Sequence, residues 1–456
     1  MGLLLLVTTY FLLTVASSLR DAPRSSCSSE AKVDELHHHL NSSGIDFTLH
    51  HPRSPCSPAP FPSLSFSAIL SHDDARVRYL AARLRNTTLA PSRSSLILQP
   101  DAASIPLSSG TSVGVGNYVT RVGLGTPVKT YVMVVDTGSS LSWLQCSPCR
   151  VSCHSQVGAV FDPAASATYR SVSCSAPECG GLLSATLNPS SCSVANVCIY
   201  QASYGDTSFS VGYLGKDSLS LGSRPALADF VYGCGQDNEG LFGKSAGLIG
   251  LARNKLSLLS QLAPRLGHSF SYCLPTMAST GYLSIGSYNP AQFSYTPMVS
   301  SSLDDTLYFV RLTGITVGGK NLPVRASAYT GTPTIIDSGT VITRLPPDVY
   351  TALSNAIVAA LKKYKREPAY SILDTCFRGT VKASAVPVVN MVFEGGATLK
   401  LAPRNVMIDV DDATMTCLAF APAGRVAIIG NRQQQTFKVV YDVANSRIGF
   451  AAGGCS

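Results

Sequence analysis

Two aspartates carry the chemistry that this sequence suggests. Asp136 lies in VVDTGSSLSW (134–143), and Asp337 lies in IIDSGTVITR (335–344). Two carboxylates brought within about 3 Å cannot both ionise, so such a pair shares one proton across the acidic range. The ionised carboxylate could take a proton from a water held between the two, and the protonated one could donate to a peptide carbonyl oxygen. The motifs therefore suggest hydrolysis of a polypeptide substrate, with no metal and no cofactor.

The residues after each aspartate suit the same purpose. Gly138 and Gly339 let the backbone turn tightly and approach the carboxylates closely. The hydroxyls of Ser139 and Thr340 can donate to the outer carboxylate oxygens, which favours the ionised form and fixes its orientation.

An internal repeat indicates how the aspartates are brought together. GLIGLA places Gly250 114 residues after Asp136, and AIIGN places Gly430 93 residues after Asp337. The longer first half contains a Cys-rich insertion at 146–198. The repeat predicts two similar lobes, each of which supplies one half of the site.

The elements that must position the site are mainly strands. From residue 118 onwards, short runs rich in Val, Ile, Tyr and Thr are separated by Gly and Pro turns, which is typical of an all-β fold. One amphipathic helix is predicted at 347–367, with Pro347 and Asp348 in its first turn. The basic residues Lys362, Lys363, Lys365 and Arg366 would then complement the C-terminal helix dipole, so they do not require a nucleic-acid partner.

The N-terminal region differs from the rest of the chain. Residues 1–18 contain a short apolar run and small residues that suit a secretory signal, and no later segment resembles a membrane span or a lipid-anchor signal. Residues 19–109 carry a Pro-rich stretch, an Arg-rich helical stretch and the glycosylation sequons at Asn41 and Asn86, and they are predicted to form a prosegment. The lobes would then be 110–290 and 291–456. We expect a secreted monomer without a membrane anchor, with the vacuole as a second destination and the plastid as a less favoured one.

The cysteines fit the same compartment. The chain has 14 cysteines, and an even number behind a secretory signal favours disulfides. The cluster in 146–198 could also be read as a zinc site, but His154 is the histidine near it, and disulfides are the preferred interpretation.

Beyond these features, the sequence resembles the pepsin-like aspartic proteases, and more closely their plant nepenthesin-type branch. The matching stretches include GLGTP (123–127), QCSPCRVSC (145–153), YGDTSFSVGYLGKD (204–217), YFVRLTGITVGG (308–319) and IIGNRQQQTFKVVYDVANSRIGFA (428–451). The N-terminal stretches HHPRSPCSP and DDARVRYL are similar as well. This resemblance implies a bilobal fold with the cleft between the lobes, and an acid endopeptidase made as a zymogen.

The resemblance also implies roles for individual residues. Asp136 and Asp337 would be the catalytic pair, and Tyr204 with Gly205 would form the flap that closes over substrate. Trp143 would hold Tyr204 through its ring nitrogen. Thr207 stands where the family usually has glycine, which puts the flexibility of this flap in doubt. The implied disulfides are Cys146–Cys149, Cys153–Cys234, Cys174–Cys198, Cys179–Cys192, Cys273–Cys455 and Cys376–Cys417.

Two other functions remain open at this stage. The chain could be a catalytically silent relative that binds or inhibits other hydrolases, or a DNA-associated plastid protease. The intact Asp motifs argue against the first, and the dispersed positive charge argues against the second, despite a formal net charge of +8.

The prosegment suggests a regulatory hypothesis. At neutral pH its arginines would pair with carboxylates near the cleft, so that the prosegment acts as an intramolecular inhibitor. The arginines concerned are Arg76, Arg78, Arg83 and Arg85. Acidification would protonate those carboxylates and charge the histidines, which would weaken the fit. The histidines concerned are His37, His38, His39, His50, His51 and His72.

Overall fold

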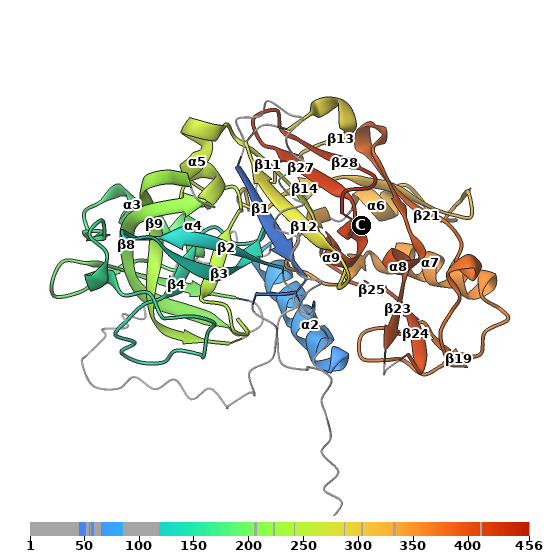
Figure 1. The fold of residues 1–456 in the computed structure, drawn as a ribbon. Coiled ribbons are helices and arrows are strands. Elements are labelled where there is room, and N and C mark those ends of the chain that lie inside the picture. The colour runs from blue at the N-terminus through green and yellow to red at the C-terminus, as the bar shows by residue number, and fades with distance from the viewer. Residues whose placement is uncertain are drawn as a thin grey trace, which may run out of the picture. The chain divides into compact units, whose positions relative to one another are not determined.

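Strands joined by short turns make up most of the fold, in agreement with the all-β prediction (Figure 1). The computed structural model describes residues 45–51, 54, 56–58, 65–84, 118–204, 208–221, 224–240, 242–286, 288–301, 304–331, 334–410 and 413–455. All of them belong to one unit, Ser42–Ser456. The predicted signal peptide, both sequons, Arg85, Gly205, Thr207 and His37–His39 lie outside the described residues.

The largest sheet runs through both lobes. Among the described residues its order is β13-β28-β27-β11-β12-β1-β2-β3-β10-β4-β9-β8-β7-β6, with β5 paired to β8. Its strands are β1 (Ile45–His50), β2 (Val119–Leu124), β3 (Lys129–Asp136), β4 (Trp143–Gln145), β5 (Arg170–Ser171), β6 (Ser191–Cys192), β7 (Cys198–Ser203), β8 (Phe209–Leu221), β9 (Arg224–Glu239), β10 (Gly247–Gly250), β11 (Ser269–Cys273), β12 (Thr280–Ile285), β13 (Ser294–Pro297), β27 (Lys438–Asp442) and β28 (Arg447–Ala451).

The C-terminal lobe adds three smaller sheets, with strand orders β14-β17-β26-β18-β25, β16-β15-β21-β22 and β19-β20-β24-β23. Their strands are β14 (Phe309–Val310), β15 (Leu312–Val317), β16 (Lys320–Asn321), β17 (Thr334–Ile336), β18 (Thr343–Leu345), β19 (Arg366–Glu367), β20 (Cys376–Arg378), β21 (Val389–Phe393), β22 (Thr398–Leu401), β23 (Met407–Val410), β24 (Met415–Leu418), β25 (Phe420–Pro422) and β26 (Ala427–Ile429).

Helices are short, apart from α2 and α7. They are α2 (Phe66–Arg83), α3 (Pro177–Gly180), α4 (Leu182–Thr186), α5 (Leu258–Leu266), α6 (Ser327–Thr330), α7 (Pro347–Ala360), α8 (Pro403–Val406) and α9 (Asn431–Gln434), with 3-10 turns at Pro163–Ala165, Pro290–Gln292, Ala383–Ala385 and Glu394–Gly396. Within the described part of the chain, none of the helices combines the length and apolarity needed to cross a bilayer.

The predicted helix at 347–367 is too long. α7 begins at Pro347 with Asp348 in its first turn, but it ends at Ala360 and has no basic residue in its last turn. Residues 366 and 367 instead form β19, where Glu367 pairs with Cys376. The dipole explanation for the basic cluster is therefore wrong. Arg366 instead lies over the ring of Phe377, 5.2 Å from its centroid.

Two elements from the predicted prosegment are built into this fold. Strand β1 pairs along its whole length with β12, from Ile45 opposite Ile285 to His50 opposite Thr280, and it also contacts β2 (Figure 1). Helix α2 packs its apolar face on the C-terminal lobe: Leu70 joins a cluster with Ile342. Val77, Leu80 and Leu84 join a second cluster on the same lobe, with Leu307, Phe309, Ile335, Val426 and Ile428.

The disulfides of the C-terminal half agree with the implied pairing, since Cys273–Cys455 and Cys376–Cys417 are both present. Those of the Cys-rich insertion do not agree. The structure contains Cys146–Cys234 and Cys149–Cys153 in place of Cys146–Cys149 and Cys153–Cys234. It also contains Cys174–Cys192 and Cys179–Cys198 in place of Cys174–Cys198 and Cys179–Cys192.

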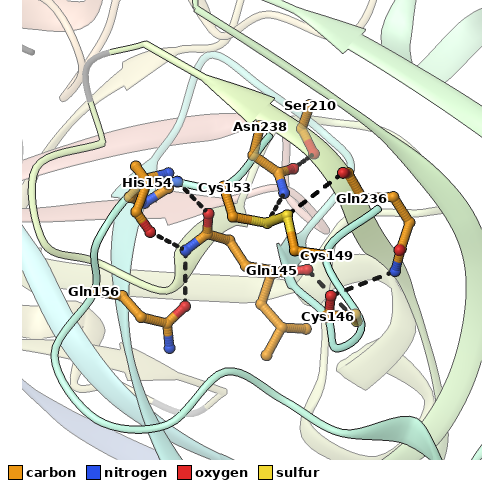
Figure 2. The surroundings of a disulfide bond; sticks show 10 residues. Gln145, Cys146, Cys149, Cys153, His154, Gln156, Ser210, Gln236 and Asn238 are labelled. Carbon is orange, nitrogen blue, oxygen red and sulfur yellow. Dashed lines mark hydrogen bonds between the residues drawn. A yellow bond between two sulfur atoms is a disulfide. The ribbon is translucent and has the colours of Figure 1, made fainter. Parts of the chain in front are cut away.

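Burial explains the corrected pairing near β4. Cys146 is fully buried next to β4, and β9 runs parallel to β4 with Leu144 opposite Cys234, which is also buried. Cys149 and Cys153 lie on the loop that follows, where they close a short ring (Figure 2). The loop is held by Gln145, whose side chain accepts from the backbone N–H of His154 at 2.9 Å (Figure 2). Each buried cysteine therefore pairs with a buried one.

The same rule holds for the second pair of bonds. Cys179 in α3 and Cys198 in β7 are both buried in the apolar cluster of the N-terminal lobe, and they pair with each other. Cys174 and Cys192 are half-buried and exposed, respectively. The implied pairing would have joined a core cysteine to a surface one in both cases.

Candidate active site

Asp136 and Asp337 occupy equivalent places in the two lobes. Asp136 ends β3, which runs parallel to β10, with Asp136 opposite Gly250. Asp337 directly follows β17, which runs parallel to β26 with Ile336 opposite Ile429, the residue before Gly430. Both aspartates are fully buried.

The two repeat glycines are required by close backbone contacts. A Cβ atom on Gly250 would lie 2.3 Å from the carbonyl oxygen of Ser140, and one on Gly430 would lie 2.8 Å from that of Val341. In each lobe the loop that follows the aspartate therefore crosses directly over the repeat glycine. This contact explains why the repeat combines Asp-Thr/Ser-Gly with a later glycine.

Each triplet glycine binds its own aspartate and faces the other one. The N–H of Gly138 donates to Asp136 Oδ1 at 2.9 Å, and the N–H of Gly339 donates to Asp337 Oδ1 at 3.1 Å. A Cβ on Gly138 would lie 3.0 Å from Asp337 Oδ1, and one on Gly339 would lie 2.7 Å from Asp136 Oδ1. Glycine at both positions thus lets the two carboxylates approach each other.

The predicted hydroxyl contacts are present in one lobe. Thr340 donates to Asp337 Oδ2 at 2.7 Å. Ser139, which was expected to do the same for Asp136, has a buried hydroxyl that forms no hydrogen bond within the described residues. The expectation for Ser139 is therefore wrong in this state. The outer oxygen of Asp136 instead faces Nη1 of Arg76, at 3.4 Å.

Arg76 from α2 lies across both carboxylates. Its Nη2 lies 2.7 Å from Asp136 Oδ1 and 3.0 Å from Asp337 Oδ1, and its Nε lies 2.9 Å from Asp337 Oδ2. The guanidinium therefore occupies the space between the carboxylates where a water would have to bind. Sequence reasoning included Arg76 among four arginines, without distinguishing it from the others.

These contacts control the charge states of the site. Burial tends to raise the pKa of Asp337, but Arg76, Thr340 and the Gly339 N–H together hold that pKa below its usual value. Burial tends to lower the pKa of Arg76, and the two carboxylates raise it well above its usual value. The ion pair is therefore favoured over its neutral form.

Arg83 is the second arginine of α2 that binds the cleft. It forms an ion pair with Asp304 at 2.6 Å, and it donates to the carbonyl oxygen of Gly138 at 3.1 Å and to Thr306 Oγ1 at 3.0 Å. Arg78 differs, because its ion pair is with Asp74, four residues earlier in the same helix. The cleft role expected for Arg78 is therefore wrong.

Sequence reasoning missed an acidic contact on the same helix. Asp73 accepts hydrogen bonds from the N–H groups of Val341 and Ile342, the second at 3.2 Å. Its Oδ2 also lies 3.1 Å from Nη2 of Arg344. The spacing of Asp73 and Arg76 in the helical stretch DDARVRYL is a signal that would have placed both residues on one face.

The predicted flap contact is present. Trp143 Nε1 donates to the hydroxyl of Tyr204 at 2.7 Å, and burial raises the pKa of that hydroxyl. Phe242, which sequence reasoning did not single out, packs edge-on against both rings, with centroids 4.7 Å from Trp143 and 5.8 Å from Tyr204. A pocket lies between α2 and this side of the cleft, lined in part by Asp136, Tyr204 and Tyr79.

Two sequence families match the part of the chain that forms the lobes. The family described as xylanase inhibitor N-terminal matches residues 118–287, and the one described as xylanase inhibitor C-terminal matches residues 307–452. An aspartyl protease family protein of Arabidopsis thaliana is 43% identical over 394 residues, 85% of this chain and 82% of that protein. Aspartic proteinase nepenthesin-2 of Nepenthes gracilis is 36% identical over 357 residues, 75% of this chain and 78% of that protein.

Solved structures share the fold at lower identity. The crystal structure of edgp has a TM-score of 0.60 at 21% identity and covers 74% of this chain and 92% of its own. Basic 7S globulin from soybean has a TM-score of 0.59 at 22% identity and covers 74% of this chain and 94% of its own. Together with the identity to the named proteases, these findings confirm the resemblance: the chain belongs to the pepsin-like aspartic proteases, in the plant branch that includes nepenthesin.

Proposed function

We propose that this protein is an aspartic endopeptidase that is made as a zymogen and works at acidic pH. The observation that carries the proposal is the convergence of Asp136 and Asp337, each held by the glycine of its own triplet, on a single guanidinium. A position that holds a cation between two carboxylates can hold a water between them once the cation leaves.

The carboxylate pair, Tyr204 and Trp143 would each have a distinct role in the reaction. The carboxylate pair shares one proton and titrates as a unit. Its ionised member takes a proton from the attacking water, and its protonated member donates to the carbonyl oxygen of the peptide bond. Tyr204 covers the substrate, and Trp143 holds Tyr204 in place through the 2.7 Å hydrogen bond. No step requires a metal or a cofactor.

The prosegment would be the intramolecular inhibitor. Arg76 neutralises the carboxylate pair, and α2 buries Leu70, Val77 and Leu80 on the C-terminal lobe. Burying such a side chain contributes roughly 1.5–3 kcal/mol. We propose secretion to the extracellular space or the vacuole, followed by removal of the prosegment, which also carries both glycosylation sequons.

The test is hydrolysis of an unfolded protein by the purified full chain at pH 3–7, with and without pepstatin. Asp136→Asn and Asp337→Asn should abolish cleavage. Asp229→Asn is the matched control, because Asp229 is an exposed residue whose ion pair is with Arg170 on the surface. The proposal is supported if the wild type and Asp229→Asn show acid-dependent, pepstatin-sensitive cleavage and both active-site variants show none. Cleavage that persists in both active-site variants contradicts it.

A second candidate is a binding protein without activity. The names of the two matching families, which refer to xylanase inhibitors, favour it. The intact pair of Asp motifs argues against it. If the folded and fully trimmed protein cleaves no substrate but inhibits a xylanase, the second candidate replaces the first.

A further inference from the structure

The contact made by Asp73 has the features of a carboxylate-binding site on the C-terminal lobe. Val341 and Ile342 donate their backbone N–H groups to the two oxygens of Asp73. Nη2 of Arg344 lies 3.1 Å from Oδ2, and the side chains of Arg344 and Asp73 are 1% and 0% exposed. Nη2 of Arg344 does not align with this oxygen as a hydrogen-bond donor, so the contact is an ion pair.

Arg344 is held in place by the lobe itself. It lies in β18, opposite Ala421 of β25 and Ile428 of β26, so its backbone belongs to the interior of a sheet. Its Nη1 donates to the carbonyl oxygen of Ile342 at 2.9 Å. The guanidinium therefore remains beside the N–H groups of residues 341 and 342 when α2 is absent.

Among the residues that the structure describes, carboxylates of α2 balance the charge of Arg344. Within the described residues its ion pairs are with Asp73, at 3.1 Å, and with Asp74, at 3.8 Å. Removal of the prosegment takes away both carboxylates. It leaves the two backbone N–H groups without their acceptor and the guanidinium without these counter-charges, and such groups favour another anionic group.

The position of this site relates it to the scissile bond. Asp73 precedes Arg76 by three residues in α2, which is a rise of about 4.5 Å along the helix axis. An extended peptide advances about 3.3 Å per residue. A carboxylate bound in place of Asp73 would therefore belong to a substrate residue within about two positions of the bond that is cut.

We propose that the activated enzyme has a subsite for an acidic side chain, formed by Arg344 and the N–H groups of Val341 and Ile342. The proposal rests on the proposed peptidase function and adds a substrate preference to it. Asp73 of the prosegment occupies this subsite before activation, in the manner of a substrate carboxylate. Arg344 is thus a specificity-determining residue that binds substrate without taking part in bond cleavage.

The test uses enzyme activated from the full chain and a peptide series with one cleavage site. A single Asp, Asn or Lys is moved through the positions around that site, and kcat/KM is measured at pH 5. We expect one position at which Asp is preferred to Asn by about tenfold, and Lys is disfavoured. Arg344→Met should bring the Asp/Asn ratio at that position close to one, and Arg344→Lys should retain part of it.

Arg311→Gln is the matched control. Arg311 is a half-exposed arginine of the same lobe, and its partner Glu394 is also on the surface. This variant should keep the wild-type ratio, which excludes a general effect of net charge.

The outcomes separate the two proposals. If even the uncharged peptides remain uncut, the peptidase function itself fails. If they are cut, but wild-type enzyme cleaves the Asp and Asn peptides equally at every position at pH 5, the acidic subsite is wrong. The acidic subsite is also wrong if Arg311→Gln loses the preference for Asp as fully as Arg344→Met does. The wild-type measurements decide the matter even if Arg344→Met does not fold.

Discussion

Thr137 and Ser338 contact each other across the two lobes, although they are 201 residues apart. The N–H of Ser338 donates to Thr137 Oγ1 at 2.9 Å, and the two hydroxyl oxygens lie 3.2 Å apart. Thr137 directly follows Asp136, and Ser338 directly follows Asp337. The contact therefore fixes the position of one half of the carboxylate pair relative to the other.

The two sides of this contact should respond differently to mutation. Thr137→Val keeps the side-chain shape but leaves the buried N–H of Ser338 without its acceptor, which costs about 1–3 kcal/mol. Ser338→Ala removes the 3.2 Å contact between the hydroxyls and the 3.4 Å hydrogen bond that the N–H of Thr137 donates to Ser338 Oγ. Both contacts are longer than the 2.9 Å bond lost in Thr137→Val, so the cost of Ser338→Ala should be smaller. Urea unfolding of the full chain measures both free energies of unfolding. Equal decreases in the free energy of unfolding would contradict the idea that the N–H of Ser338 makes the main hydrogen bond of this contact.

Arg76 and Arg78 provide a matched pair for testing autoinhibition. Arg76→Gln leaves the two carboxylates without the charge that balances them, and breaking such a buried ion pair costs about 3–5 kcal/mol. Processing of the full chain at pH 5 should therefore be faster by at least tenfold. Arg78→Gln removes only an exposed ion pair within α2 and should process like wild type. Gel analysis over time measures both, and equal rates for the two variants would refute the role of Arg76.

The proposed release of α2 should depend on pH through the groups that face this helix. With α2 bound, the pKa of Asp337 lies below the usual aspartate value of about 3.9. The ionised Asp337 therefore stabilises the binding of α2 above about pH 4. This stabilisation is lost as the pH falls through the lowered pKa. Burial raises the pKa of Asp73 despite Arg344, so Asp73 takes up protons more readily when bound and does not drive release in acid. The wild-type chain should begin to process below about pH 4, and in Arg76→Gln this onset should move to higher pH. Onset near pH 6 in the wild type would contradict this account.

The sequence predicted the parts of the fold that depend on local pattern. The paired triplets, the later glycines and the strand-rich composition were sufficient for two β lobes with Asp136 and Asp337 at equivalent positions. Contacts between distant segments could not be predicted in the same way. Asp73 reaches a site 268 residues further along the chain, and no local pattern identifies such a partner. The cysteine pairing depended on which cysteines each strand buries, and Ser139 lost its expected contact because Arg76 lies at the same carboxylate.

The corrected disulfides predict unequal effects on stability. The Cys146–Cys234 bond spans 88 residues and the Cys149–Cys153 bond spans 4. In the chain-entropy description these bonds stabilise by about 4–5 and about 2 kcal/mol, respectively. Replacing Cys146 and Cys234 by Ala should therefore lower the free energy of unfolding by more than replacing Cys149 and Cys153. Mass spectrometry of unreduced peptides checks the pairing itself, and a peptide that links Cys153 to Cys234 would contradict it.

The hydrogen bond between Trp143 and Tyr204 should be visible as an energetic coupling in catalysis. Trp143→Phe and Tyr204→Phe each remove one side of the 2.7 Å contact and keep an aromatic ring to pack on Phe242. Each should lower kcat/KM of the activated enzyme about tenfold, since the flap tyrosine loses the group that orients it. The double variant should be little worse than either single one, which gives a coupling of about 1 kcal/mol. Strictly additive losses would mean that the two residues act on the substrate independently, and that the indole N–H does not position the flap.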